Sequence, residues 1–233
     1  MHISPDQVVL WQWRGLELNA TIVFTWGVMA LLVAGARAIT WRLSDNESLS
    51  RWQNLLEVLV VGLRDQIRDV SQAEPGRYLP FVGTLFIFIA TANTLAVVPG
   101  FEPPTGSLST TTALALCVFF AVPLYAIAEQ GVVTYLRKYT QPTFFMLPFN
   151  VIGEISRTIA LAVRLYGNVM SGTLIAAILI GVAPFFFPVL MQLLGLLTGL
   201  IQAYIFAVLA MVYIASARRS HAGEAGGNGG EAQ

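Results

Sequence analysis

One arginine stands inside a stretch of sequence that is otherwise apolar enough to be buried in lipid. It is Arg164, in the segment 161–173, which reads LAVRLYGNVMSGT. A charged side chain deep in a bilayer is costly, so it is expected to face a partner or a water-filled cavity. About ten mostly apolar residues follow Asn168, which places Arg164 well inside the segment. We therefore interpret Arg164 as a functional cation, in preference to an arginine that snorkels to the headgroups or pairs within its own chain.

The residues around Arg164 are spaced as one helix face. In an α-helix, Asn168 lies one turn after Arg164 and Arg157 lies two turns before it. Small side chains let another transmembrane helix approach closely. Four small residues lie on or beside this face: Ala160, Gly167, Ser171 and Gly172.

The composition is that of an integral membrane protein. Hydrophobic residues make up 56% and charged residues 11%, and the mean hydropathy is +0.68. The net charge is zero and no basic run suggests a nucleic-acid partner. The chain has no GxxxxGK loop and no His and Cys cluster, so we expect no ATP hydrolysis by this chain, no cofactor and no metal. The single cysteine, Cys117, excludes an internal disulfide.

Five apolar runs are long enough to cross a bilayer. They are 18–39, 79–98, 111–136, 148–181 and 189–217. The fourth run is longer than a perpendicular span needs, and a strong tilt would accommodate it. We therefore predict an all-α membrane protein with five transmembrane helices, the last two of which form a long tilted hairpin.

The rest of the chain divides around this membrane domain, 18–217. Apolar residues recur every three or four positions over 49–70, which predicts an amphipathic helix at the cytoplasmic surface, against a neighbouring subunit or lipid headgroups. Residues 1–17 are expected to be an external segment before an uncleaved first helix, because they lack a positive n-region. The Gly-rich tail, 218–233, is expected to be disordered.

The distribution of basic residues predicts the orientation. Arginine and lysine lie between the first and second runs, after the third and after the last, whereas the connections 99–110 and 183–188 hold none. By the positive-inside rule, the N-terminus is outside and the C-terminus is cytoplasmic. The outer loop over 101–110 reads as an exposed turn with one acid, Glu102.

Other polar residues in the runs allow more than one interpretation. Asn93 can line an aqueous path or bond a neighbouring helix, and the sequence favours neither. Glu129 is followed closely by Arg137 and Lys138, which favours an interfacial residue over an ion site.

The last run carries a narrow polar and glycine stripe. Its glycines form a GxxxG pair that suits helix packing. Gln202 is a buried amide that needs partners, for which Asn168 and Arg164 are candidates. The stripe comprises Gln192, Gly195, Gly199, Gln202 and Phe206.

Three stretches resemble subunit a of rotary ATP synthases, the stator subunit that carries ions past the rotating c-ring. The run RLYGN at 164–168 resembles that family's arginine signature. Residues 80–104 resemble its second membrane helix and the following loop, and QAYIF at 202–206 resembles its last helix. Together these matches span about 75–216.

The resemblance implies a multi-pass protein of a bacterial inner membrane, with the c-ring, subunit b of the peripheral stalk and lipid as partners. It implies two half-channels separated by an essential arginine, through which H⁺, or alternatively Na⁺, reaches the ring. The residues expected in ion translocation are Arg164, Asn168, Gln202, Thr173, Asn93 and Thr198. Those expected to pack at the ring face are Arg157, Gly167, Ser171, Gly195 and Gly199.

The sequence departs from the family at two positions. Many relatives have a glutamate where Thr173 stands, and some have a histidine where Gly195 stands. Because His2 and His221 lie outside the spans, the outer half-channel is expected to use water and neutral groups. This departure leaves the ion open and suggests a divergent branch, such as the sodium-linked N-type ATPases. The rival hypotheses are an autonomous channel or transporter, in which Arg164 binds an anion, and a structural membrane scaffold.

Overall fold

The computed structural model describes residues 9–13, 16–41, 51–71, 74–98, 100–132, 146–181 and 186–219. Its helices lie within a few residues of the five apolar runs and the amphipathic segment, as predicted. The elements in chain order, with η for a 3₁₀ helix, are β1 (Val9–Trp13), β2 (Leu16–Asn19), α1 (Ala20–Thr40), α2 (Arg51–Ser71), η2 (Pro75–Arg77), α3 (Leu79–Leu95), η3 (Pro104–Gly106), α4 (Leu108–Gln130), α6 (Met146–Ile180) and α7 (Phe186–Arg219).

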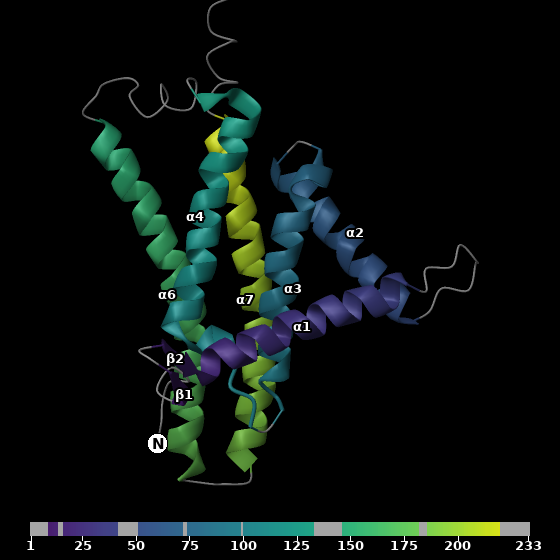
Figure 1. The fold of residues 1–233 in the computed structure, drawn as a ribbon, viewed down its shortest axis with the longest axis vertical. Coiled ribbons are helices and arrows are strands. Elements are labelled where there is room, and N and C mark those ends of the chain that lie inside the picture. Colours follow the sequence, from purple (N-terminus) through teal and green to yellow (C-terminus); the bar gives the residue numbers. More distant parts are fainter. Residues whose placement is uncertain are drawn as a thin grey trace, which may run out of the picture.

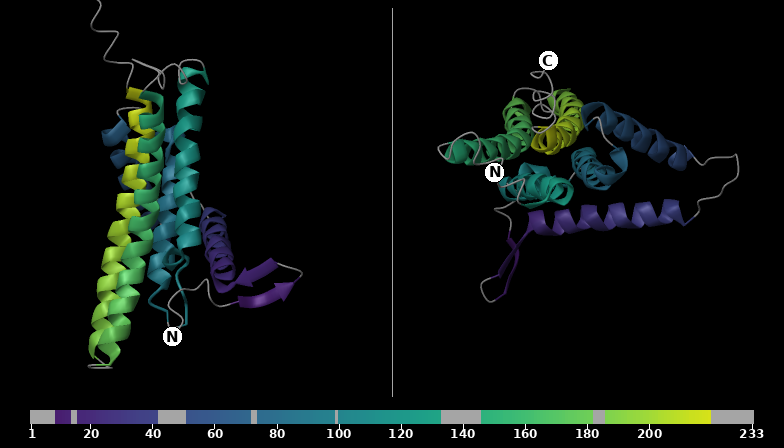
Figure 2. Two further views of the ribbon diagram at one scale, coloured as in Figure 1. Left: turned by 90° about the vertical axis from the view of Figure 1, so that its left-hand side faces the viewer. Right: turned by 90° about the horizontal axis from the view of Figure 1, so that it is seen from above.

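The helices form three layers (Figures 1 and 2). The hairpin of α6 and α7 makes one outer layer, α3 and α4 make the middle layer, and α1 lies on the far side. α1 crosses the other helices at a steep angle, whereas α3, α4, α6 and α7 run roughly along one another. The spans therefore cannot all share one tilt in the bilayer.

The apolar helices confirm an all-α membrane protein. Among the described residues, α1, α4, α6 and α7 are long and apolar enough to span a membrane, and α3 is a shorter apolar helix. α6 has 35 residues and α7 has 34. At 1.5 Å per residue each is about 50 Å long, well beyond a hydrocarbon core of about 30 Å. This length agrees with the predicted tilt of the hairpin.

Two short segments differ from the sequence-based expectation. A small antiparallel hairpin, β1 and β2, covers part of the predicted external segment and the first two residues of the predicted first span, where no strand was expected. The loop after α3 is not an exposed turn, because Pro104, Thr105, Gly106 and Ser107 are all buried. Of the predicted disordered tail, the first two residues belong to α7 and the rest lie outside the described residues.

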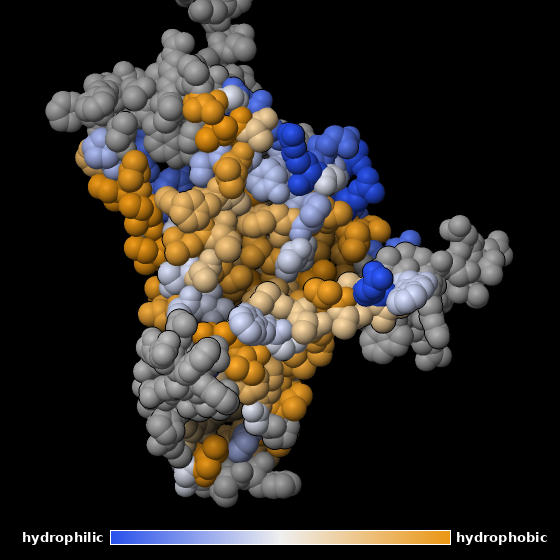
Figure 3. Space-filling view, in the orientation of Figure 1, coloured by the Kyte–Doolittle hydropathy of each residue, from blue (hydrophilic) through white to orange (hydrophobic). Residues whose placement is uncertain are grey.

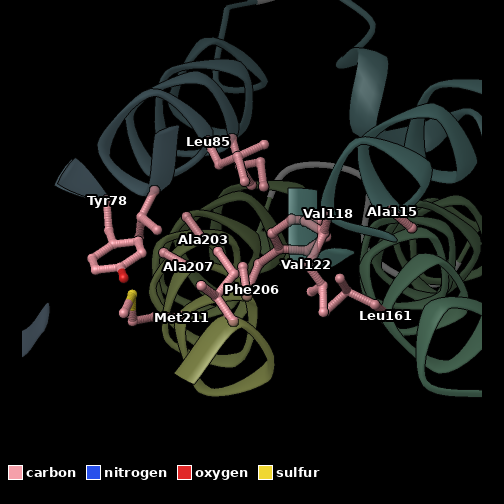
Figure 4. Close-up of a cluster of buried hydrophobic side chains, with 14 of the residues drawn as sticks. Tyr78, Leu85, Ala115, Val118, Val122, Leu161, Ala203, Phe206, Ala207 and Met211 are labelled. Carbon is pink, nitrogen blue, oxygen red and sulfur yellow. The ribbon is translucent and has the colours of Figure 1, made fainter. Parts of the chain in front are cut away.

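The core lies where α7 meets the middle layer. Phe206 is fully buried among side chains from α3, α4 and α6, and Tyr78 lies at the edge of the same cluster (Figure 4). Alanines of α7, including Ala203 and Ala207, allow α3 and α4 to approach closely. The C-terminal half of α7 is therefore fixed by this chain alone.

The amphipathic helix α2 packs on the outside of this core. Leu63 and Ile67 are buried, and they border a narrow gap against Val82 of α3 and Met211 of α7. Gln66 accepts a hydrogen bond from the Tyr204 hydroxyl group of α7. Hydrophilic residues collect around α2, while much of the visible remainder is apolar (Figure 3). This distribution agrees with a helix at a membrane surface.

Candidate functional site

Arg164 lies on the exposed surface of α6, in the middle of one continuous helix. Its neighbours Leu161 and Leu165 are buried, so the buried stripe of α6 ends beside it. Arg164 has no ion pair or hydrogen bond with any residue that the structure describes. Within the described part of the chain, this guanidinium in an apolar span is therefore left without a counter-charge.

The other polar residues of the α6 face lie at the predicted spacing. Arg157 is paired with Glu154 at 3.8 Å and also lies 5.7 Å from the centre of the Tyr213 ring of α7. The Ser171 hydroxyl group donates to the carbonyl oxygen of Asn168 at 3.1 Å. Arg157 is thus held by its own chain, in contrast to Arg164.

Asn93 ties the hairpin to the middle layer. Its Nδ2 donates to the carbonyl oxygen of Gly199 at 2.9 Å, and its Oδ1 accepts from the Thr105 hydroxyl group at 2.7 Å. A Cβ atom added at Gly199 would lie 2.9 Å from Cβ of Asn93. The glycine is therefore needed for the close approach of α3 and α7, and it faces α3 rather than the ring face that we predicted.

A cavity of about 370 Å³ lies between the hairpin and the loop after α3. Asn93 thus bonds a neighbouring helix, and it also lines the cavity; its place in an aqueous path stays a prediction. The cavity brings together most of the residues that we predicted to carry ions. Its polar and glycine lining consists of Asn93, Glu102, Asn168, Gly172, Thr173, Gln192, Gly195, Thr198 and Gly199.

Two residues that we predicted to lie in the ion path, Arg164 and Gln202, do not line the cavity. Arg164 is one helical turn from Asn168, and Gln202 is one turn from Thr198. Gln202 is 6% exposed, and its Nε2 has no hydrogen-bond partner among the described residues. The structure also gives Gln202 Oε1 no hydrogen bond within the described residues, so the predicted bonds from Gln202 to Asn168 or Arg164 are not formed there. The remaining predicted residue, Gly167, has open space around its Cβ position.

Sequence reasoning missed Glu102 as a site residue. It lines the cavity, and its Oε2 is buried without a hydrogen-bond partner among the described residues. The composition of the loop suggested solvent exposure, because Pro, Gly, Ser and Thr are typical of surface turns. The one available signal was the acid itself, next to the expected path.

At the opposite end of the bundle, Glu129 takes part in a local polar contact. It accepts a hydrogen bond from the Tyr78 hydroxyl group and lies 3.5 Å from an Arg77 nitrogen. This contact joins the start of α3 to the end of α4. That Glu129 lies at the membrane interface rather than at an ion site stays a prediction, and Arg137 and Lys138, on which it depended, lie outside the described residues.

Comparison with known proteins agrees with the resemblance. A family model described as ATP synthase A chain matches residues 22–215. ATP synthase subunit a 2 of Acaryochloris marina is 64% identical over 217 residues, which cover 93% of each chain. ATP synthase subunit a 1 of Chlorobaculum parvum is 60% identical, covering 94% of this chain and 97% of the relative. ATP synthase subunit a of Albidiferax ferrireducens is 58% identical, covering 94% and 95%.

Proposed function

The chain belongs to the ATP synthase A chain family, and from this premise we propose that it is the ion-conducting stator subunit of a rotary ATP synthase. The observation that carries this proposal is Arg164, which has no partner among the described residues and lies on the exposed surface of a 35-residue apolar helix. The relatives are named as subunits of ATP synthase, so the chain works within that complex. It does not itself hydrolyse ATP.

Arg164 acts on the membrane carboxylate of each ring subunit. That carboxylate must be neutralised by an ion to cross lipid at low cost, and it ionises where it meets water. The permanent charge of Arg164 attracts the emptied carboxylate and repels a cation that would otherwise leak past it. Because Arg164 has no competing partner among the described residues, its charge is free for this task.

The cavity beside α6 and α7 serves as the outer half-channel. It lies at the end of the bundle where α6 ends and α7 begins, and the sequence of the two connections at 99–110 and 183–188 holds no basic residue. Asn168, Thr173 and Thr198 supply neutral oxygen atoms along it. Such groups suit a water-filled path for H⁺ and are also ligands for Na⁺.

The open side of the hairpin receives the c-ring. In the most apolar window of α6, 6% of the residues are buried within this chain, compared with 33% in α7. Gly167 and Ser171 leave room near Arg164 for a ring helix. Subunit b is the second protein partner. The chain lies in a bacterial inner membrane with the N-terminus outside and the C-terminus in the cytoplasm, as the arginine distribution favours.

ATP-driven uptake of H⁺ and of Na⁺ by inverted vesicles tests the proposal. Vesicles carry the assembled complex with either the natural chain or Arg164→Ala. The natural complex should pump one ion, and the variant should assemble but lose coupled pumping. A variant that pumps as well as the natural complex would make Arg164 a structural cation.

The rival of an autonomous channel or transporter makes a different prediction. The purified chain in liposomes would then transport cations or anions in the absence of a c-ring. We expect no such transport, and we expect the chain to copurify with the c-ring.

A further inference from the structure

Among the described residues that line the cavity, Glu102 is the single titratable side chain. The lining residues from α3, α6 and α7 are all neutral. One carboxylate oxygen of Glu102 is buried and meets no hydrogen-bond donor among the described residues. A buried carboxylate is unfavourable unless a proton, a cation or water compensates it. The side chain thus needs a proton, a cation or water from the cavity as its partner.

The loop holds Glu102 in a defined place. Phe101 packs edge-on against Phe24 of α1, with ring centres 5.0 Å apart. On the other side of Glu102, Thr105 is fully buried and bonded to Asn93. A Cβ atom added at Gly106 would lie 3.3 Å from Val169 of α6, so the loop sits tightly against the hairpin. These contacts on both sides fix the backbone of the loop, so Glu102 is held beside the cavity.

The cavity leads from Glu102 toward the arginine. Its volume of about 370 Å³ is well above what a single water needs, so the cavity has room for water. Polar groups of Thr173, Thr198 and Asn168 lie along its walls, and Asn168 is one turn from Arg164. Water in this space would connect the loop to the surface that carries Arg164.

We propose that Glu102 is the carboxylate that takes up the translocated cation from the outer side and releases it into the cavity. This inference rests on the proposed function. With H⁺, the carboxylate accepts one proton from hydronium, leaves water behind, and then gives the proton to a water in the cavity. With Na⁺, the carboxylate oxygens replace part of the hydration shell of the ion.

ATP synthesis driven by an imposed ion gradient tests this uptake step. The assembled complex is placed in vesicles, and the concentration of H⁺ or Na⁺ on the outer side of the chain is varied. Glu102→Gln keeps the shape of the side chain but removes its charge. We expect a rate at least about tenfold lower when the coupling ion is limiting, and a smaller deficit as its concentration rises. Glu57→Gln, on the exposed surface of α2, is the matched control and should follow the natural complex.

A second variant separates ion uptake from a structural role. Thr173 lines the same cavity from α6, so Thr173→Glu in the Glu102→Gln chain supplies a carboxylate from another element. We expect it to recover most of the lost rate. If Glu102→Gln lowers the yield of complex, Glu102→Asp is used instead. With rates normalised to the amount of assembled complex, Glu102→Asp should raise the ion concentration at which the rate is half-maximal.

Two results would overturn the inference. One is an assembled Glu102→Gln complex that follows the natural complex at every concentration of both ions. The other is an unchanged half-saturating concentration in Glu102→Asp where only that variant assembles. In either case Arg164→Ala still abolishes coupling if the proposed function is right, so the two failures are distinguishable.

Discussion

The two sides of the α6–α7 hairpin differ in how far their polar groups are bonded, and their side chains packed, by other described parts of this chain. On the side toward α3, both ends of the Asn93 amide are bonded, Gly199 admits close contact, and Phe206 is fully buried. We call the exposed surface of α6 and α7 the open face; it includes Val163, Arg164, Ser171, Leu197 and Ile201. There Arg164 has no partner among the described residues.

This difference indicates a division of labour within one pair of helices. The inner side determines the fold of the chain, so changes there should act on stability. In the proposed function the open face is left for lipid and for the c-ring, so changes there should act on coupling. A contact that must form and break repeatedly cannot be as fully hydrogen-bonded and tightly packed as the contact of Asn93 with Gly199 and Thr105.

The largest effect is expected from Arg164→Lys on the open face. Lysine keeps a positive charge at neutral pH in water, but a buried amine can lose its proton and has no planar fork of donors. We expect coupled pumping to fall at least about tenfold, with unchanged assembly. Pumping at the natural level would mean that any cation suffices at this position.

Gly199→Ala tests the inner side. The added methyl group meets Asn93 at 2.9 Å, so overpacking should cost about 1–3 kcal/mol of stability. Thermal denaturation of the purified complex, followed by release of this chain, measures the loss. Gly195→Ala is the matched control on the same helix, because nothing lies within 4 Å of its Cβ position. Equal stability of the two variants would contradict the close contact.

Thr105→Val should have a smaller effect. It removes the 2.7 Å hydrogen bond to Asn93 and leaves a buried amide oxygen unsatisfied, at a cost of about 1–2 kcal/mol. Thr198→Val is the control, because its hydroxyl group bonds only carbonyls of its own helix. In the same denaturation assay, the Thr105→Val complex should be less stable than the Thr198→Val complex.

Arg77→Gln should have the smallest effect. The Arg77 side chain is 56% exposed and lies 3.5 Å from Glu129, and exposed pairs contribute under about 1 kcal/mol. The Glu129 carboxylate keeps its bond from Tyr78. A loss as large as that of Gly199→Ala would show that this end of the bundle is as important as the inner side of the hairpin.

The sequence predicted the elements that depend on long apolar runs. Hydropathy and helical spacing located the five apolar helices and α2, and they placed Arg164, Asn168 and Ser171 on one face. These features depend on local composition, which a single sequence records directly. The steep crossing of α1 depends on packing between distant segments, so the runs alone did not indicate it.

The site residues that were misjudged also depend on distant contacts. Gly199 belongs to the contact with Asn93, which lies on another helix. The loop around Glu102 is buried because Thr105 bonds Asn93 and Gly106 meets Val169. No local signal distinguishes such a loop from an exposed turn of the same composition.

Cysteine cross-linking between the open face and the c-ring tests the division between the two sides most directly. Cys117, the one natural cysteine, is first changed to Ser. Ser171→Cys on the open face is then compared with Leu124→Cys on α4, which is also exposed. Each is paired with a cysteine one turn from the membrane carboxylate of the ring. We predict that oxidation cross-links position 171, and not position 124, to the ring and stops ATP-driven pumping. Cross-linking at position 124 alone would contradict the assignment of the open face to the ring.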